Sequence, residues 1–88
     1  MKLKVYSIYD VKTEVYNQPF FMHRDAQATR SVVDLVSDPQ SSVSKHPEDY
    51  ILYRLGEFDD NTGVYDPVTP PCFVMQLSAL ANQDKQVS

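Results

Sequence analysis

Side chains alternate along the first ten residues, and this two-residue period predicts a β-strand from Lys2 to Asp10. One side of the strand is uncharged and consists of Leu3, Val5, Ser7 and Tyr9. The other side ends in charge and consists of Lys2, Lys4, Tyr6 and Ile8. Because charged side chains stay in water, we expect the uncharged side of this strand to face the core.

A hairpin is predicted next. The polar run from Asp10 to Thr13 turns the chain back, and residues 14–22 form the returning strand. Pro19 has no N–H group to give to a sheet, so this second strand is expected at an edge or with a bulge.

The segment from Asp25 to Ser37 has the period of a helix. Its apolar stripe, with the spacing i, i+4, i+7 and i+8, consists of Ala28, Val32, Leu35 and Val36. Pro39 ends the helix after Asp38. Residues 40–45 are polar and rich in serine, and we expect them to form a loop.

The second half of the chain predicts another hairpin. Residues 50–58 are aromatic and aliphatic and indicate a strand, residues 60–63 a turn, and residues 64–65 a short strand. Three prolines then favour an irregular segment: Pro67, Pro70 and Pro71. Residues 72–77 favour a last strand, although Phe73, Leu77 and Leu80 also fit a helical turn.

These elements together predict an α+β fold. An antiparallel sheet of about four strands, in the chain order ββαββ, carries one helix packed on one face. We expect a single domain over residues 1–81 and a disordered polar tail over residues 82–88.

The composition suits a small intracellular domain. Eighty-eight residues, 42% of them hydrophobic, make one modest core, so we expect a homo-oligomer and favour a dimer. Cys72 is the only cysteine and forms no internal disulfide, which is typical of a reducing cytoplasm. No run of about eighteen apolar residues occurs, so we expect no membrane span.

The net charge of −4 is unevenly distributed. Residues 1–30 carry five basic and three acidic side chains, whereas residues 31–88 carry three basic and nine acidic ones. Nucleic acid is bound through cations that displace counterions from phosphates. The sequence therefore allows a local basic face and argues against a broad basic groove.

One set of residues has the chemistry of a single-strand binding site. Lys2, Lys4 and Tyr6 share a side of the first strand, and Arg54 lies on a neighbouring strand with Tyr50 and Leu52. Bases stack on aromatic rings beside positive charge, and Lys12 and Arg24 are secondary candidates. Alternatively, Tyr6 and Tyr50 pack in a second core or a dimer interface, with the lysines at its rim. Binding at these residues requires an exposed Tyr6.

Catalytic chemistry is not expected. The carboxylates of Glu48, Asp49, Glu57, Asp59 and Asp60 lie around one loop and one hairpin, where water screens them. General acid–base catalysis instead needs a pair of groups in unlike environments. We predict no enzymatic activity and no cofactor.

A metal site is not expected either. His23, His46 and Cys72 lack the spacing of a zinc site. The run from Asp59 to Gly63 lacks the full length and the closing glutamate of a calcium loop. We interpret this run as a hairpin turn.

Several segments resemble the small non-structural protein of gokushovirus-type microviruses, which are phages with single-stranded DNA. They are KVYSIYD, QPFFM, KHPEDYILYRLGEFDD and the TG that follows, and the resemblance runs from about Met1 to Val68. Members of that family are labelled non-structural or DNA-binding and are associated with single-strand synthesis and packaging. The resemblance implies a phage protein in the cytoplasm of a bacterial host, and it implies no particular site residues.

We therefore expect weak binding to single-stranded DNA without base specificity, in genome replication or packaging, with an affinity that falls steeply as salt is added. The alternative is a protein-interaction module, in which the acidic residues after Ser31 bind a basic phage or host replication protein or a capsid protein. A third interpretation is a structural oligomer whose strand edges pair between subunits.

Overall fold

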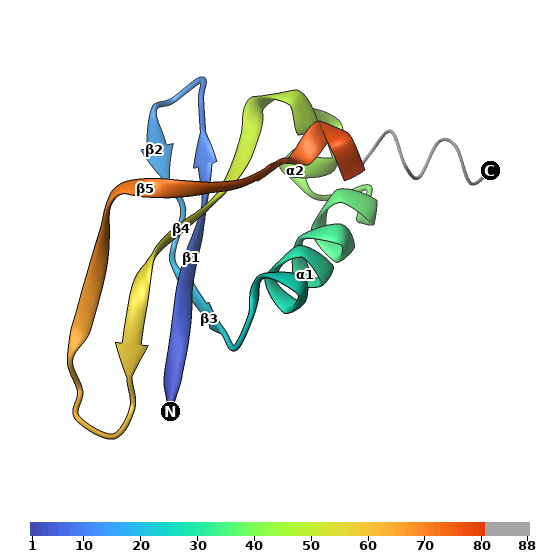
Figure 1. The fold of residues 1–88 in the computed structure, drawn as a ribbon. Coiled ribbons are helices and arrows are strands. Elements are labelled where there is room, and N and C mark those ends of the chain that lie inside the picture. Colours follow the sequence, from blue (N-terminus) through green and yellow to red (C-terminus); the bar gives the residue numbers. More distant parts are fainter. Residues whose placement is uncertain (81–88) are drawn as a thin grey trace.

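The computed structural model describes residues 1–80, and in this range an antiparallel sheet is covered by helices on one face (Figure 1). The sheet order is β2-β1-β4-β5, and β3 also pairs with β1. The strands are β1 (Lys2–Asp10), β2 (Val15–Tyr16), β3 (Phe20–Met22), β4 (Tyr50–Asp59) and β5 (Tyr65–Gln76). The α+β prediction is confirmed, with five strands in place of about four. The expected tail over residues 82–88 lies outside the described residues.

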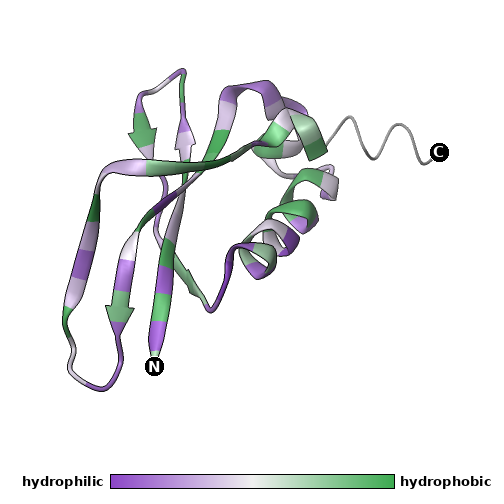
Figure 2. Ribbon diagram, in the orientation of Figure 1, coloured by the Kyte–Doolittle hydropathy of each residue, from purple (hydrophilic) through white to green (hydrophobic). Residues whose placement is uncertain are grey.

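Strand β1 is the centre of the sheet. It pairs with β4 over its whole length, from Lys2 opposite Asp59 to Asp10 opposite Tyr50. Its other edge pairs with the two short strands β2 and β3. Figure 2 shows hydrophobic and hydrophilic residues alternating along β1, as expected for a strand whose two faces differ.

The expected second strand is broken into two. Residues 17–19 leave the ladder between β2 and β3, although the Asn17 N–H still donates to the Ile8 carbonyl at 2.9 Å. Pro19 explains the break, because it supplies no N–H to β1. The preceding turn is held by the Asp10 carboxylate, which accepts hydrogen bonds from the N–H groups of Lys12 and Thr13.

Helix α1 (Asp25–Ser37) has the predicted bounds, and three of the four predicted stripe residues are buried: Ala28, Val32 and Val36. Leu35 was wrongly placed in the stripe, because 41% of it is exposed. The stripe packs on the side of the sheet that carries Tyr6, Ile8 and Leu52.

The predicted core face of β1 was therefore wrong in part: Val5 and Ser7 are buried as expected, but the main core cluster lies on the other face. The helix covers the half of the face that carries Tyr6 and Ile8, which are both buried. Lys2 is exposed and Lys4 half-buried at the far end of the same face, beyond the core cluster. Charge at one end of a strand face did not prevent burial of its other end.

The loop expected over residues 40–45 contains a short helix, α2 (Ser42–Lys45). The Ser41 hydroxyl accepts a hydrogen bond from the Val43 N–H at 3.1 Å and caps its start. Val43 is buried in the core, which attaches this segment, expected to be a polar loop, to the rest of the fold. The 3₁₀ turn η1 (Pro47–Asp49) then leads into β4.

Strand β5 runs through the prolines that were expected to make this segment irregular. It lies at the edge of the sheet, where a missing N–H costs no ladder bond on the open side. Its register against β4 shifts between Arg54 and Gly56, which absorbs the extra residues of the proline segment. Beyond Gln76 the chain turns helical, and Leu77 and Leu80 enter the core.

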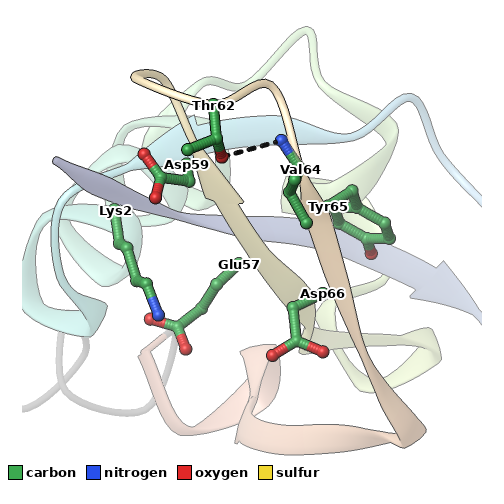
Figure 3. A pocket seen from close by; sticks show the side chains of 7 residues that line it. All are labelled: Lys2, Glu57, Asp59, Thr62, Val64, Tyr65 and Asp66. Carbon is green, nitrogen blue, oxygen red and sulfur yellow. Dashed lines mark hydrogen bonds between the residues drawn. The ribbon is translucent and has the colours of Figure 1, made fainter.

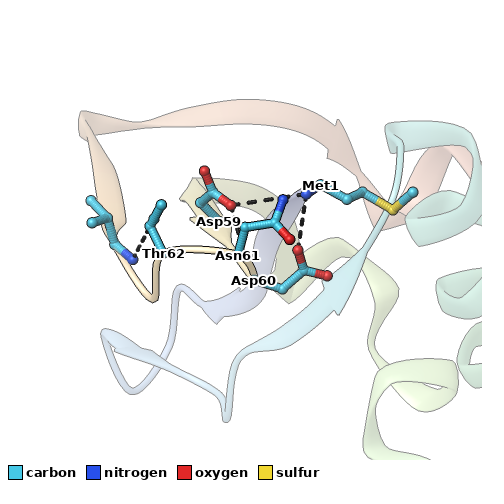
Figure 4. A network of polar contacts seen from close by, with 6 residues as sticks. Met1, Asp59, Asp60, Asn61 and Thr62 are labelled. Carbon is cyan, nitrogen blue, oxygen red and sulfur yellow. Dashed lines mark hydrogen bonds and ion pairs between the residues drawn. The ribbon is translucent and has the colours of Figure 1, made fainter.

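The hairpin between β4 and β5 is the predicted turn. Gly63 adopts a φ of 75°, and its N–H donates to the Asp59 carbonyl at 2.7 Å. The Asp59 carboxylate accepts from the Asn61 N–H at 2.9 Å, and the N-terminal ammonium of Met1 lies 2.9 Å from a carboxylate oxygen of Asp60 (Figure 4). The turn is thus closed by its own polar groups and by the N-terminal ammonium.

We expect Gly56→Ala to destabilise the fold by about 1–3 kcal/mol, because overpacking here meets backbone as well as side chain. A Cβ at this position would lie 2.5 Å from the Asp66 carbonyl oxygen and 2.8 Å from the Tyr65 hydroxyl. The free energy of unfolding in urea measures the effect. Gly63→Asn is the matched control, since no atom lies within 4 Å of the added Cβ and asparagine tolerates positive φ. Equal losses in the two variants would contradict the expectation.

Candidate nucleic-acid interface

The structure places four of the predicted contact residues on one face of the sheet, the face that α1 covers in part. Lys2 lies opposite Asp59, Lys4 opposite Glu57, and Tyr6 opposite Arg54. Side chains of directly opposed residues point to the same face, so the predicted grouping is present. Tyr6, however, is completely buried, and its ring cannot stack on a base. The prediction of Tyr6 as a contact residue was wrong.

Tyr6 instead connects the sheet to the start of α1. Its hydroxyl donates a hydrogen bond to the Asp25 carboxylate, and its ring stacks on Phe20 with 5.8 Å between centroids. Burial raises the pKa of the Tyr6 hydroxyl well above its usual range, and the neighbouring Asp25 raises it further. A tyrosine with this environment is a structural residue.

Arg54 belongs to the same polar cluster. Its Nη1 lies 3.5 Å from Oδ2 of Asp25, and its Nη2 lies 3.8 Å from Sγ of Cys72. Only 27% of the Arg54 side chain is exposed. Its charge is already partly balanced by a carboxylate, which weakens its attraction for a phosphate.

Lys2 lies in an acidic environment. It lines a recess of about 290 Å³ beside the β4–β5 hairpin (Figure 3). Three carboxylates line the same recess: Glu57, Asp59 and Asp66. Lys2 points towards Glu57 in Figure 3, and the pKa of Asp59 is held below its ordinary value, chiefly by the Asn61 N–H. A phosphate in this recess would meet more negative than positive charge.

The two secondary candidates lie elsewhere. Lys12 is exposed in the turn that follows β1, at the opposite end of that strand from Lys2. Arg24 is exposed immediately before α1. The fold therefore does not gather the predicted cations into one continuous basic stripe.

An aromatic cluster that the sequence analysis missed lies on the opposite face of the sheet. The rings of Tyr9 and Tyr16 are 4.6 Å apart between centroids, and Tyr53 lies within about 6 Å of both (6.0 and 5.8 Å). Phe73 extends the cluster from Tyr53 at 6.3 Å. Four strands contribute one ring each, and the rings form one group across the sheet.

We call this side of the sheet the aromatic face. The strand register assigns it the following residues: Leu3, Val5, Ser7, Tyr9, Tyr16, Phe21, Ile51, Tyr53, Phe58, Tyr65 and Phe73. None of these residues is charged. Phe73 is 59% exposed, Phe21 51% and Tyr16 41%. Val5 and Ser7 of this face are buried, whereas all of its rings are at least partly exposed. A neutral sheet face with exposed aromatic rings is suited to contact with a flat or apolar partner.

The signal for this face was present in the sequence but was misassigned. The uncharged side of β1, with Tyr9, was recognised and placed in the core. Tyr16, Tyr53 and Phe73 join Tyr9 only through strand pairing, which the period of a single strand does not reveal.

Burial among these rings raises the pKa of Tyr16, and the nearby Tyr53 and Tyr9 hydroxyls add to the effect.

Within residues 1–80, one group of side chains has the types and spacing that could hold a cation. Ligand atoms of His46, Glu48 and Asp49 lie within 4.8 Å of one another. His46 and Glu48 are exposed, and Nδ1 of His46 is 3.9 Å from a carboxylate oxygen of Glu48. Exposed acidic groups of this kind are common without an ion, and we assign no metal to them.

Comparison with known families identifies the chain's relatives. The model of the phage ORF5 protein family matches residues 3–80, which is most of the chain. The chain belongs to the phage ORF5 protein family. This membership confirms the phage origin implied by the resemblance described above. No curated protein and no solved structure shows significant similarity to this phage protein. Among its described helices, none is long and apolar enough to cross a membrane.

Tyr6→Phe should reduce the free energy of unfolding by about 1–2 kcal/mol at neutral pH, because the Asp25 carboxylate loses its donor. Since the pKa of Tyr6 is higher in the folded than in the unfolded chain, this contribution is complete below about pH 10 and is lost as the pH rises further. Urea unfolding of both proteins between about pH 7 and 11 measures the difference.

Tyr65→Phe is the control, since 46% of Tyr65 is exposed and the same atom is removed. A difference between wild type and Tyr6→Phe that stayed constant above pH 10 would show that the buried hydroxyl does not act in this way.

Proposed function

We propose that this phage protein binds single-stranded DNA without base specificity, through the aromatic face, during genome replication or packaging. The observation that supports the proposal is the cluster of four rings on an open face of the sheet, formed by Tyr9, Tyr16, Tyr53 and Phe73. Every base has a flat π-surface, so stacking on such rings tolerates any sequence. The resemblance of the sequence to a protein of single-stranded DNA phages supplies the biological context.

Because this face is uncharged, it has consequences for how the DNA affinity depends on salt. Phosphate contacts produce the salt dependence of DNA affinity, and each contact adds to the slope. The aromatic face carries no cation, because Lys2 and Lys4 of β1 lie on the opposite face and Lys12 lies in the turn that follows β1. We therefore expect a shallow salt dependence, in contrast to the steep one expected for a site built on lysines.

A second candidate function is favoured by the acidic recess on the other face. Glu57, Asp59 and Asp66 are gathered beside the β4–β5 hairpin, and Asp60 is exposed at its tip. Such a surface attracts basic proteins and increases their association rate. In this version the partner is a basic phage or host replication protein, or a capsid component. Neither function involves catalysis, and the absence of enzymatic activity stays a prediction.

Replacing Phe73 or Tyr16 by alanine should weaken DNA binding by about 5- to 150-fold each, which corresponds to the roughly 1–3 kcal/mol of one stacked base. Fluorescence anisotropy of a labelled oligonucleotide, at low and moderate salt, measures the affinity. Leu35→Ala is the matched control, because Leu35 is 41% exposed on the helix, on the other side of the sheet. If wild-type protein bound no oligonucleotide at tens of micromolar in low salt, the proposal would fail.

Reversing both Lys2 and Lys4 to glutamate separates the two possible DNA sites. These lysines lie on the face opposite the aromatic cluster, so we expect the oligonucleotide affinity to change by less than about threefold. A loss of binding comparable with that of Phe73→Ala would place the DNA on the charged face instead. The same double variant should leave the binding of a basic protein at the acidic recess intact or strengthened.

A further inference from the structure

The aromatic face exposes several large apolar side chains. Its most exposed rings are those of Phe73, Phe21, Tyr65 and Tyr16, with exposed fractions between 59% and 41%. Phe21 also contacts Phe58 edge-on at 5.9 Å, so a second aromatic pair continues the cluster towards the other end of the sheet. Contiguous patches of this kind on soluble proteins mark interaction sites.

Charge selects the partner that fits this face. Strand register places the charged strand residues on the opposite face: Lys2, Lys4, Asp10, Arg54, Glu57, Asp59 and Asp66. With a net charge of −4, two copies of the chain repel each other over most of their surface. The neutral face is where two copies can meet without opposing like charges, and where both lose apolar surface from water.

The strand edges are poor routes for self-association. Strand β5 is one edge of the sheet and contains Pro67, Pro70 and Pro71, none of which can donate to a new strand. The other edge is split between β2 and β3 at Pro19. The third interpretation of the sequence was that strand edges pair between subunits. Neither edge of this sheet offers a long uninterrupted run of backbone groups for such pairing.

We propose that two copies of this chain pack aromatic face against aromatic face, and that this association masks the rings until single-stranded DNA displaces the second copy. The arrangement is a two-sheet sandwich with α1 on each outer side, related by a two-fold axis so that both copies present the same patch. The displacement rests on the proposed DNA binding, whereas the dimer face does not. Aromatic side chains at the centre of such an interface carry most of its binding energy.

Sedimentation equilibrium of the full chain without DNA tests the dimer. Wild type should change from monomer to dimer as concentration rises, and the double variant Tyr16→Ala/Phe73→Ala should raise the dissociation constant at least about 10-fold. Leu35→Ala should leave it unchanged, and far-UV circular dichroism should show that all variants are folded. A wild type that stays monomeric up to about 1 mM, or equal weakening by Leu35→Ala, would overturn the proposed face.

An oligonucleotide of five thymidines, too short for two chains to share, tests the displacement. Saturating amounts should convert the dimer into a complex that contains one protein chain. If the oligonucleotide bound to an intact dimer, the proposed masking of the rings would be wrong, whereas the proposed DNA binding would still hold. If no oligonucleotide bound while the double variant still weakened the dimer, DNA binding would be overturned and the dimer face supported.

Discussion

The arrangement of this protein depends on the hydrogen bond between the buried Tyr6 hydroxyl and the Asp25 carboxylate, with Arg54 beside it. Asp25 is the first residue of α1, so the contact attaches the start of the helix to the centre of the sheet. It satisfies a polar atom that would otherwise be costly to bury. The apolar stripe of α1 packs on this same face of the sheet, so the hydrogen bond and the core hold the helix to one side and leave the other side without a helix.

Covering one face separates the two kinds of chemistry in the molecule. On the face of the sheet that α1 covers in part, the core lies at one end and the charged residues around Lys2 and Glu57 lie at the other. The open side keeps the rings of Tyr9, Tyr16 and Tyr53. An acidic protein can therefore present a neutral surface, and net charge alone is a poor guide to what such a protein binds.

In the proposed function, the aromatic face binds single-stranded DNA without a basic groove. Stacking supplies affinity without phosphate contacts, and the same rings suit a second copy of the chain. If one surface serves both proposed partners, DNA binding and self-association compete. Such competition would keep free protein soluble while leaving the rings available to exposed single strands.

The sequence by itself determined the secondary structure that local chemistry controls: β1, the helix from Asp25, β4, and the turn closed by Gly63. Alternation, helical period and turn residues are short-range signals, so they can be interpreted from a single sequence. Sequence also grouped Lys2, Lys4 and Tyr6 on one side of a strand. Only the tertiary structure decided that Tyr6 is buried and that Tyr16, Tyr53 and Phe73 join Tyr9. Strand pairing and helix placement join residues far apart in the chain, and no local pattern encodes which face they cover.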